Sequence, residues 1–293
     1  MSWRDGYIAV DWGTTNRRAY ALDGSRNLID SFEDELGLLA VPSGGFEAAA
    51  ADIRERLGDR PMLLAGMVGS NRGWREAPYA AAPAGARDLA EAIAWIEPGR
   101  TGIVPGVSQR GAAGADVMRG EEVQVLGAVA AGLVPADCVI CHPGTHAKWI
   151  LMEAGRIASF RTMMTGEVFS LLSKHSILAD QLEGDGAADD AFRAGVAEAL
   201  AGRELLSALF GIRARHLLGE EVGDPASYAS GLLVGSDVRA GLGLYPDRPL
   251  ALIGRPELCE LYRAAMAEAG REAPEVDGAE AFVAGMNMLT EML

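Results

Sequence analysis

The stretch YIAVDWGTTNRRAYALDGSRNLIDSF, residues 7–32, decides the fold prediction. It starts as an apolar strand that reaches a turn at Gly13 and Thr14. A second strand follows over 18–22, and Gly24 marks the turn into a third strand that ends in Ser-Phe. Short apolar runs bounded by glycine turns are typical of antiparallel hairpins. The stretch therefore predicts three consecutive strands joined by two turns.

The same order of features returns in CVICHPGTHAKWILMEAGRIASF, residues 138–160. An apolar strand leads to Gly144 and Thr145, a second strand covers 148–152, and Gly155 lies as far from its turn glycine as in the first stretch. The two copies are separated by 131 residues. Agreement in turn position, hairpin length and strand pattern indicates a duplicated domain with a ligand cleft between the copies.

The Gly-Thr turns have the composition of a phosphate site. Glycine lets the backbone approach a ligand closely, successive N–H groups in such a turn bind anions, and threonine adds a hydroxyl donor. Asp11, at the end of the first strand, is placed to position Mg²⁺, often through water. The predicted phosphate-binding residues are Gly13, Thr14, Thr15, Gly144, Thr145 and Lys148. The alternative is a pair of ordinary hairpins with solvated turns.

The segment CVICHPGTH, residues 138–146, allows two further interpretations. C-x-x-C-H is the attachment signature of c-type haem, and two cysteines with His142 and His146 would suffice for zinc. Haem attachment normally follows export, and we see no export signal. In a strand, Cys138 and His142 face one side and Cys141 the other, so the four side chains would not converge. We therefore predict a structural strand.

Composition limits the classes of function. The 293 residues suggest about two domains, and the net charge of −15 disfavours nucleic acid and anionic membranes, which need a basic face. No run of about 18 apolar residues predicts a transmembrane helix, and MSWRDGYIAVDWG has no signal-peptide pattern. Three cysteines without an export signal predict a reducing cytoplasm.

A polar loop over 69–75 follows the segment 61–66, which has the composition of a buried strand. Loops at the ends of buried strands in α/β domains commonly contact substrates. Ser70, Asn71 and Trp74 provide a hydroxyl, an amide and an aromatic face, which together suit a polyol. A plain surface loop is the alternative.

The segment DVMRGEEVQVLGAVA, residues 116–130, predicts a helix that begins after Gly120 with two glutamates in its first turn. Acidic residues in that turn favour the helix dipole, so capping is one interpretation. The helix also leads directly into the second Gly-Thr hairpin. That order places Glu121 or Glu122 near the cleft, where a carboxylate takes a proton from a substrate hydroxyl.

Two later glycines are less specific candidates for nucleotide contact. Gly254 ends an apolar strand over 249–253 and precedes a predicted helix, and Gly235 lies in the predicted helix around SGLLVGSD, residues 230–237. A strand–glycine–helix unit can contact a base or ribose, and a purely structural turn has the same pattern.

The first hairpin resembles the phosphate-1 motif of the actin/hexokinase/Hsp70 ATPase superfamily through its segment DWGTT. The second resembles the phosphate-2 motif, with His142 where many members have aspartate, so we give that position no metal role. Glu121 falls where glycerol-kinase-like enzymes have a catalytic aspartate. The resemblance implies an α/β protein with two duplicated ribonuclease-H-like (actin-like ATPase) domains, which we place at 1–133 and 134–293, and a nucleotide cleft between them.

Over nearly its whole length the chain resembles the 2-dehydro-3-deoxygalactonokinase family. The segments that carry this resemblance are IAVDWGTTNRRAY, AGMVGSNRGWREAPY, DVMRGEEVQVLGA, PGTHAKWI, FRTMMTGE and SGLLVGSDV. The family implies a cytoplasmic kinase that uses ATP and Mg²⁺ to phosphorylate 2-dehydro-3-deoxy-D-galactonate at its 6-hydroxyl in galactonate breakdown. The gluconate-derived epimer is the competing substrate, and monomer and homodimer both stay open.

The acceptor implied by this resemblance is a polyol with a carboxylate, which arginine forks bind at two points. The sequence does not choose among Arg18, Arg119 and Arg161. The predicted substrate-binding residues are Asn16, Arg18, Ser70, Asn71, Trp74, Arg119 and Arg161. The predicted catalytic residues are Glu121, with Glu122 as the alternative base, and Asp11, which also positions the metal.

Two other functions use the same fold. A phosphohydrolase of the exopolyphosphatase type would direct the phosphate cradle and the carboxylate at water, and the polyol-type loop argues against it. A non-catalytic, nucleotide-driven scaffold of the actin kind is the other alternative, and the chain lacks obvious large insertions for that role.

Overall fold

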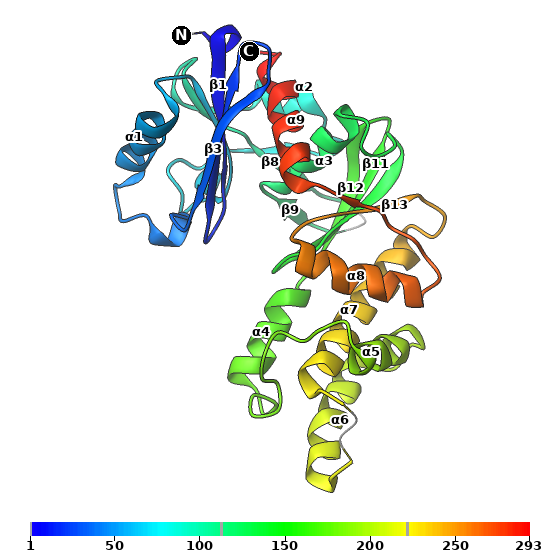
Figure 1. Ribbon diagram of the computed structural model, residues 1–293. Coiled ribbons are helices and arrows are strands. Elements are labelled where there is room, and N and C mark those ends of the chain that lie inside the picture. Colours follow the sequence, from blue (N-terminus) through cyan, green and yellow to red (C-terminus); the bar gives the residue numbers. More distant parts are fainter. Residues whose placement is uncertain (1, 112–113, 221–222) are drawn as a thin grey trace. The chain divides into compact units, whose positions relative to one another are not determined.

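The computed structural model describes residues 2–111, 114–220 and 223–293, which form an α/β protein with two compact units (Figure 1). Unit 1 comprises Met1–Ala136, Met152–Ser159 and Asp277–Leu293, and unit 2 comprises Asp137–Leu151 and Phe160–Val276. The last helix of the chain therefore belongs to the first unit. The domain division at residues 133 and 134 stays a sequence prediction.

Unit 1 is built on a six-stranded sheet in the order β3-β2-β1-β4-β7-β6. The antiparallel pairs of its first three strands follow the prediction made from residues 7–32. β1 and β4 pair in parallel near the middle of the sheet and are almost wholly buried, which explains their continuous apolar sequences. The strands are β1 (Gly6–Trp12), β2 (Arg17–Asp23), β3 (Leu28–Asp34), β4 (Met62–Gly66), β6 (Ala94–Glu97) and β7 (Thr101–Ile103).

Helix α1 (Phe46–Leu57) packs on this sheet and has the bounds expected from its apolar face. Ala50 and Ile53 enter the core on that face. The sequence predicts a helix over 46–57 with Ser43 as its cap. The N-cap residue is Gly45 instead, because a further turn, in which the Gly45 N–H donates to the Pro42 carbonyl, separates Ser43 from the helix.

The last helix, α9 (Gly278–Thr290), packs along α3 (Glu121–Ala130) (Figure 1). A Cβ atom at Gly127 would lie 1.9 Å from the Ala281 carbonyl oxygen, so this close approach requires glycine. The packing fixes the helix that begins with the two glutamates. The other elements of unit 1 are η1 (Trp3–Asp5), η2 (Leu38–Ala40), η3 (Met67–Gly69), α2 (Ala86–Glu91), β5 (Tyr79–Ala81), β8 (Gly106–Gln109) and β9 (Asp116–Met118).

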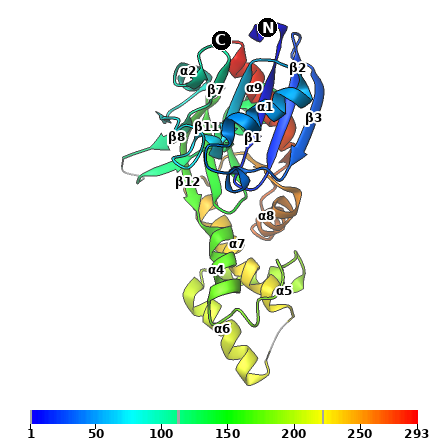
Figure 2. The same cartoon turned by 90° about the vertical axis from the view of Figure 1, so that its left-hand side faces the viewer.

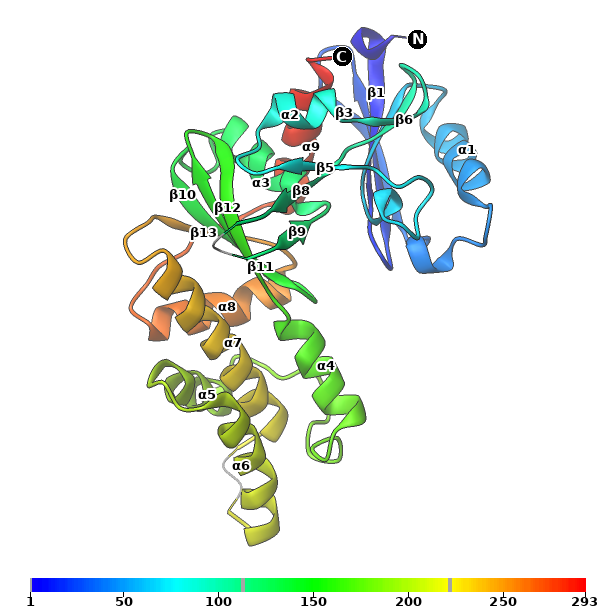
Figure 3. The same ribbon diagram turned by 180° about the vertical axis from the view of Figure 1, so that it is seen from behind.

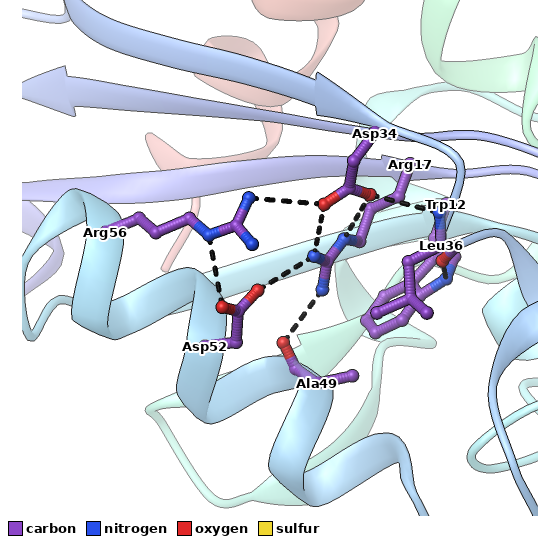
Figure 4. Close-up of polar contacts among 7 residues, drawn as sticks. All are labelled: Trp12, Arg17, Asp34, Leu36, Ala49, Asp52 and Arg56. Atoms are coloured by element: carbon purple, nitrogen blue, oxygen red, sulfur yellow. Dashed lines mark hydrogen bonds and ion pairs between the residues drawn. The ribbon is translucent and has the colours of Figure 1, made fainter.

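A buried cation joins β2, β3 and α1 inside unit 1 (Figure 4). Arg17 is fully buried and donates to both carboxylate oxygens of Asp34, at 2.6 and 3.1 Å. It also donates to Asp52 at 3.0 Å and to the Ala49 carbonyl at 2.8 Å. We call these four residues the Arg17 cluster. Arg17 begins the strand that follows the first Gly-Thr turn, so the cluster anchors that turn to the unit.

Unit 2 repeats the layout of unit 1. Its sheet has the order β12-β11-β10-β13-β14, with three consecutive strands on one side and two later strands on the other. β13 pairs in parallel with β10, as β4 does with β1. The prediction of a duplicated α/β domain is confirmed, and so is the strand over CVICH. The strands are β10 (Cys138–His142), β11 (Ala147–Glu153), β12 (Arg156–Met163), β13 (Leu250–Ile253) and β14 (Glu275–Val276).

The helices α4 to α7 of unit 2 gather at one end of that unit (Figure 2). α7 runs from this group to the sheet (Figure 3). There Gly241 packs directly on the indole of Trp149. Within the described ranges, no helix has the length and apolarity that a membrane span needs. The helices are α4 (Thr165–His175), α5 (Asp190–Leu200), α6 (Leu205–Leu218), α7 (Pro225–Leu244) and α8 (Pro256–Glu268).

Candidate active site

The first Gly-Thr turn connects β1 to β2 and is held from behind by backbone hydrogen bonds. The Gly13 N–H donates to the Asn16 carbonyl at 2.9 Å and closes the turn. Gly37 donates to the Thr15 carbonyl at 2.9 Å, and the next two residues donate to the carbonyls of Gly13 and Thr14. Thr14 and Thr15 are exposed. The carbonyls are thus engaged on the protein side, which leaves the threonine side chains on the solvent side.

A glycine is required behind this turn. A Cβ atom at Gly37 would lie 2.2 Å from the carbonyl carbon of Thr15 and 2.6 Å from the carbonyl oxygen of Thr14. Backbone cannot move aside as a flexible side chain can, so any side chain at residue 37 would displace the turn. The sequence analysis did not identify Gly37, because it lies more than twenty residues beyond the turn that it supports.

Asp11 lies near the end of β1, with its side chain 23% exposed. Burial raises the pKa of its carboxyl to about 6, the Arg18 guanidinium at 3.8 Å lowers it, and the Glu121 carboxylate raises it further. Glu121 is therefore close enough to Asp11 for their charges to interact. Two acids from separate motifs of the sequence therefore lie at the same edge of unit 1.

Arg18 and Asn16 share one acidic partner on β3. Arg18 pairs with Glu33 at 2.9 Å, and the Asn16 amide donates to the same carboxylate oxygen at 3.1 Å. Glu33 lies directly opposite Arg18 in the antiparallel register. The sequence analysis missed Glu33, although an acid placed across from an arginine in a predicted hairpin is a recognisable cross-strand pair. Arg18 therefore lies between two carboxylates.

Glu121 and Glu122 differ sharply in environment although they are adjacent in α3. Glu121 is half-buried, and one of its carboxylate oxygens accepts from the Arg119 N–H at 3.1 Å. Glu122 is fully buried; one oxygen accepts from the Gly120 N–H at 2.6 Å, and the other has no hydrogen-bond partner among the described residues. Burial, and secondarily the Glu121 charge, raises the pKa of Glu122 to about 8.

Gly120 allows the start of α3 to lie close to the ends of β1 and β4. Its φ of +108° is in the region that favours glycine, and a Cβ atom there would lie 3.3 Å from the Cα atom of Gly66. A Cβ atom at Gly66 would in turn lie 3.5 Å from an Asp11 carboxylate oxygen. The end of β4, the end of β1 and the start of α3 therefore converge, which explains why Asp11 and Glu121 influence each other.

Arg119 is fixed by the segment that follows the predicted substrate loop. Its guanidinium donates to the Ala77 carbonyl at 2.8 Å and lies 4.3 Å from the centre of the Tyr79 ring. The nitrogens Nε and Nη1 are buried and have no hydrogen-bond partner in the part of the chain that the structure describes. A Cβ atom at Gly69 would lie 2.9 Å from Nη1. Arg119 thus lies against the start of the substrate loop.

The predicted substrate loop itself is partly packed. Trp74 is half-buried and stacks on Phe46 with ring centres 6.4 Å apart, so its aromatic face is shared with the core. The Ser70 hydroxyl accepts from the Arg72 N–H at 3.3 Å, and Asn71 is exposed. A cavity of about 560 Å³ opens beside this loop, lined by Leu38, Val41, Pro42, Ser43, Gly44, Phe46, Glu47, Arg72, Gly73 and Trp74.

The second Gly-Thr turn connects β10 to β11 and is supported by the start of α4. The Glu167 N–H donates to the Thr145 carbonyl at 2.9 Å. A Cβ atom at Gly166 would lie 2.7 Å from the Gly144 carbonyl oxygen, so a glycine is required behind this turn too. His146 and Glu167 add a side-chain contact of 2.5 Å between the turn and the helix. Gly166 belongs to the family segment FRTMMTGE, but the sequence does not show that this glycine supports the second turn.

Of the other predicted residues of unit 2, Gly254 and Lys148 lie close to the second Gly-Thr turn, whereas Gly235 packs between helices. Gly254 lies beside the second turn, because a Cβ atom there would be 3.2 Å from the Pro143 carbonyl oxygen. Lys148 is buried on β11 and donates to the His146 carbonyl at 3.3 Å. Arg161 is half-buried on β12. Gly235 instead packs against α5, so close helix packing accounts for that glycine.

The residues of unit 1 suit a water-mediated magnesium ion rather than a protein cage. Among the described residues, no three His, Cys, Asp or Glu side chains are grouped so that they could hold a metal. Mg²⁺ usually keeps several waters and takes only one or two carboxylates together with substrate phosphates. Asp11, a poorly solvated carboxylate next to the first Gly-Thr turn, fits that requirement, because a nearby cation favours its charged form.

Together these features define a class of protein. Two ribonuclease-H-like units, each with a glycine-backed Gly-Thr turn after its first strand, and a carboxylate at the start of α3 are the architecture of phosphotransferases with the actin-like ATPase fold. The same fold occurs in the activator of the 2-hydroxyisocaproyl-CoA dehydratase from Clostridium difficile with bound ADPNP, with a TM-score of 0.52 at 12% identity over 98% of this chain and 95% of that chain.

The family model of 2-keto-3-deoxy-galactonokinase matches residues 11–289. The 2-dehydro-3-deoxygalactonokinase of Escherichia coli (strain K12) is 35% identical over 290 residues, with 97% of each chain covered. A crystal structure of a protein described as a 2-dehydro-3-deoxygalactonokinase from Sinorhizobium meliloti has a TM-score of 0.90 at 32% identity, with 98% of each chain covered. The chain belongs to the 2-keto-3-deoxy-galactonokinase family and is a phosphotransferase, as the sequence motifs predicted.

Proposed function

We propose that the protein transfers the γ-phosphoryl group of ATP to the 6-hydroxyl of 2-dehydro-3-deoxy-D-galactonate. The observation that carries this proposal is that the end of β1, with Asp11, and the start of α3, with Glu121, converge at Gly66 beside the first Gly-Thr turn of unit 1. Family membership supplies the acceptor, since the relative from Escherichia coli is named for it. ADP and the 6-phosphorylated sugar acid are the products.

The two Gly-Thr turns bind the phosphates. Gly13, Thr14 and Thr15 form one turn, and Gly144 and Thr145 form the other; the glycine-backed backbone keeps each in a fixed shape. Lys148 contributes positive charge behind the second turn. Asp11 holds Mg²⁺ through water, and the cation supplies neutralisation of the phosphate charge. Phosphoryl transfer depends mainly on positioning and charge neutralisation, and this arrangement serves both.

Glu121 is the general base in this proposal. It is half-buried at the start of α3, near Asp11, and accepts the proton of the 6-hydroxyl as that oxygen attacks the γ-phosphorus. Glu122 is a poor choice for this role, because burial raises its pKa to about 8 and it is largely protonated at neutral pH. We assign Glu122 to holding the Gly120 turn instead, through its 2.6 Å hydrogen bond.

The acceptor is a polyol that carries a carboxylate, and unit 1 offers polar groups for both parts. Ser70 and Asn71 lie on the loop beside the 560 Å³ cavity, and Trp74 lines that cavity. Asn16 and Arg18 lie beside the phosphate-1 turn and share Glu33. The proposed substrate-binding residues are Asn16, Arg18, Ser70, Asn71, Trp74 and Arg119, with Arg161 as a candidate from unit 2.

The test is an ADP-release assay with Mg-ATP and a panel of acceptors. The panel contains 2-dehydro-3-deoxygalactonate, its gluconate epimer, glycerol, glucose and a reaction without acceptor. ADP formed with the first compound alone is the expected result. Equal rates with both epimers would keep the kinase but reject the stereochemical choice. Equal ADP or phosphate release without acceptor would reject the proposal in favour of hydrolysis.

A further inference from the structure

Asp237 is a buried carboxylate that the proposed mechanism does not use. It lies in α7 with 5% of the residue exposed, and its surroundings are the apolar core of unit 2. One carboxylate oxygen accepts from the Trp149 indole N–H at 2.6 Å. The other accepts from the Tyr262 hydroxyl at 2.5 Å and from the Thr165 hydroxyl. We call these four residues the Asp237 cluster.

The three donors come from three different elements. Trp149 lies on β11, Thr165 is the first residue of α4, and Tyr262 lies on α8. Burying a carboxylate in an apolar core costs free energy unless several hydrogen bonds compensate for the lost water. A leucine would fill the same volume without the cost of burying a charge. The cluster therefore does something that apolar packing alone would not do, namely fix the relative positions of these elements.

Each of the three elements borders the second Gly-Thr turn. Thr165 immediately precedes Gly166, which packs on the Gly144 carbonyl. β11 begins directly after the turn and its short continuation. α8 follows Gly254, which lies against the Pro143 carbonyl next to Gly144. A single carboxylate thus connects three elements that support the turn from inside unit 2.

We propose that Asp237 is a positioning residue that holds the second Gly-Thr turn in the shape that binds the phosphates of a nucleoside triphosphate. The inference rests on the proposed function, since it presumes that this turn binds ATP. Asp237 touches no reacting atom; it acts through the Thr165 hydroxyl, which sets the start of α4 and thereby the position of Gly166 against the turn.

The substitution Thr165→Val tests this directly, because valine keeps the shape of threonine and removes the hydroxyl. We expect the KM for ATP and the Kd for ATP in the absence of acceptor to rise about tenfold, which corresponds to about 1.4 kcal/mol. The KM for the acceptor is expected to stay within about twofold. Thr165→Ser retains the hydroxyl and should restore ATP binding, which a purely structural role for the methyl group would not allow.

Ser236→Ala is the matched control, since Ser236 neighbours Asp237 in α7 and its hydroxyl is buried without a hydrogen-bond partner among the described residues. It should leave both KM values unchanged. Direct ATP binding, measured by calorimetry, keeps this test separate from the acceptor assay: absence of turnover in the wild type counts against the proposed function alone. Unchanged ATP binding in Thr165→Val, or equal losses for ATP and acceptor, would overturn the role of Asp237.

Discussion

The two halves of the molecule share a backbone plan, and each buries a cation behind its Gly-Thr turn, but they differ in the charge of the side chain that ties the surrounding elements together. The spacing of 131 residues that separates Gly13 from Gly144 also separates Arg17 from Lys148. In unit 1 the buried anchor is a cation, Arg17, which is completed by acids of β3 and α1. In unit 2 the anchor is an anion, Asp237, which is completed by neutral donors.

The charges around the two turns suit different roles, proton transfer and metal binding at the first turn and phosphate binding at the second. Around the first turn the ionisable groups are mainly acids, namely Asp11, Glu33 and Glu121, with Arg18 among them. Around the second turn they include Lys148 and the His146–Glu167 pair. Acids can take a proton and hold a metal ion, whereas a turn backed by a lysine suits phosphate. Duplication thus provided two Gly-Thr turns of one plan, and in the proposed function the surrounding charges place the proton transfer in unit 1.

The largest effect is expected for Glu121, because general-base catalysis contributes about 10²–10⁴-fold to rate. Glu121→Gln should lower kcat by that factor and change the two KM values little. Glu122→Gln is the matched control: it keeps the carbonyl oxygen that accepts from Gly120, and it should retain most of the activity at neutral pH. Steady-state kinetics would contradict the division of roles if the Glu122→Gln variant lost turnover and the Glu121→Gln variant kept it.

The second prediction concerns Arg17 and Lys148, the two buried cations that the duplication relates. Arg17→Met should lower the free energy of unfolding by about 2–4 kcal/mol, somewhat less than for a fully buried pair, because Asp34 and Asp52 keep partial contact with water. Its guanidinium also stacks against the Trp12 and Phe32 rings, and that contact would be lost.

Lys148→Met is the comparison for that experiment. It should change stability less than Arg17→Met and instead raise the KM for ATP, since the Lys148 ammonium group lies behind the second turn and donates to the His146 carbonyl there. Urea denaturation and kinetics on both variants provide the test. Equal destabilisation of the two variants would show that the halves use their buried cations in the same way.

Much of the fold could be predicted because it is encoded locally. The hairpins over 7–32 and 138–160 have their turns and strands in sequence order, and their duplication predicts the same sheet layout twice. The bounds of α1 were predicted correctly from its apolar face, whereas the predicted cap, Ser43, was wrong. The last helix is also predicted from the sequence over 279–292, but its packing partner is not, because the contact between Gly127 and Ala281 joins residues far apart in the chain.

The sequence predicts which motifs supply the candidate site, but it does not predict which of their residues lie close together. Asp11 and Glu121 belong to separate motifs, and only the fold shows that their charges interact across Gly66 and Gly120. The difference between Glu121 and Glu122 was not predictable either, because adjacent helix residues point in directions about 100° apart and only tertiary packing decides which is buried. Supporting groups such as Asp237 give no local signal, since their donors come from distant elements.

The most specific prediction, with the smallest change per measured step, compares the two buried carboxylates. Asp237 has three side-chain donors, whereas Glu122 accepts from Gly120 and has an oxygen without a partner among the described residues. Burial raises the pKa of Glu122 from 4.5 to about 8, so between these values the folded state binds more protons than the unfolded state. Stability from this group is therefore full at low pH, falls as pH rises through about 5 to 8, and levels off above that range.

Glu122→Gln imitates the protonated form and should remove this dependence. Relative to the variant, the wild type should lose on the order of 1 kcal/mol of unfolding free energy per pH unit between about pH 5 and 8. Glu55→Gln, an exposed site on α1, is the control and should run parallel to the wild type. Urea denaturation at about pH 5, 6, 7 and 8 provides the measurement. Parallel curves for wild type and Glu122→Gln would mean that Glu122 is ionised in the folded protein, and the reason for preferring Glu121 as the base would be lost.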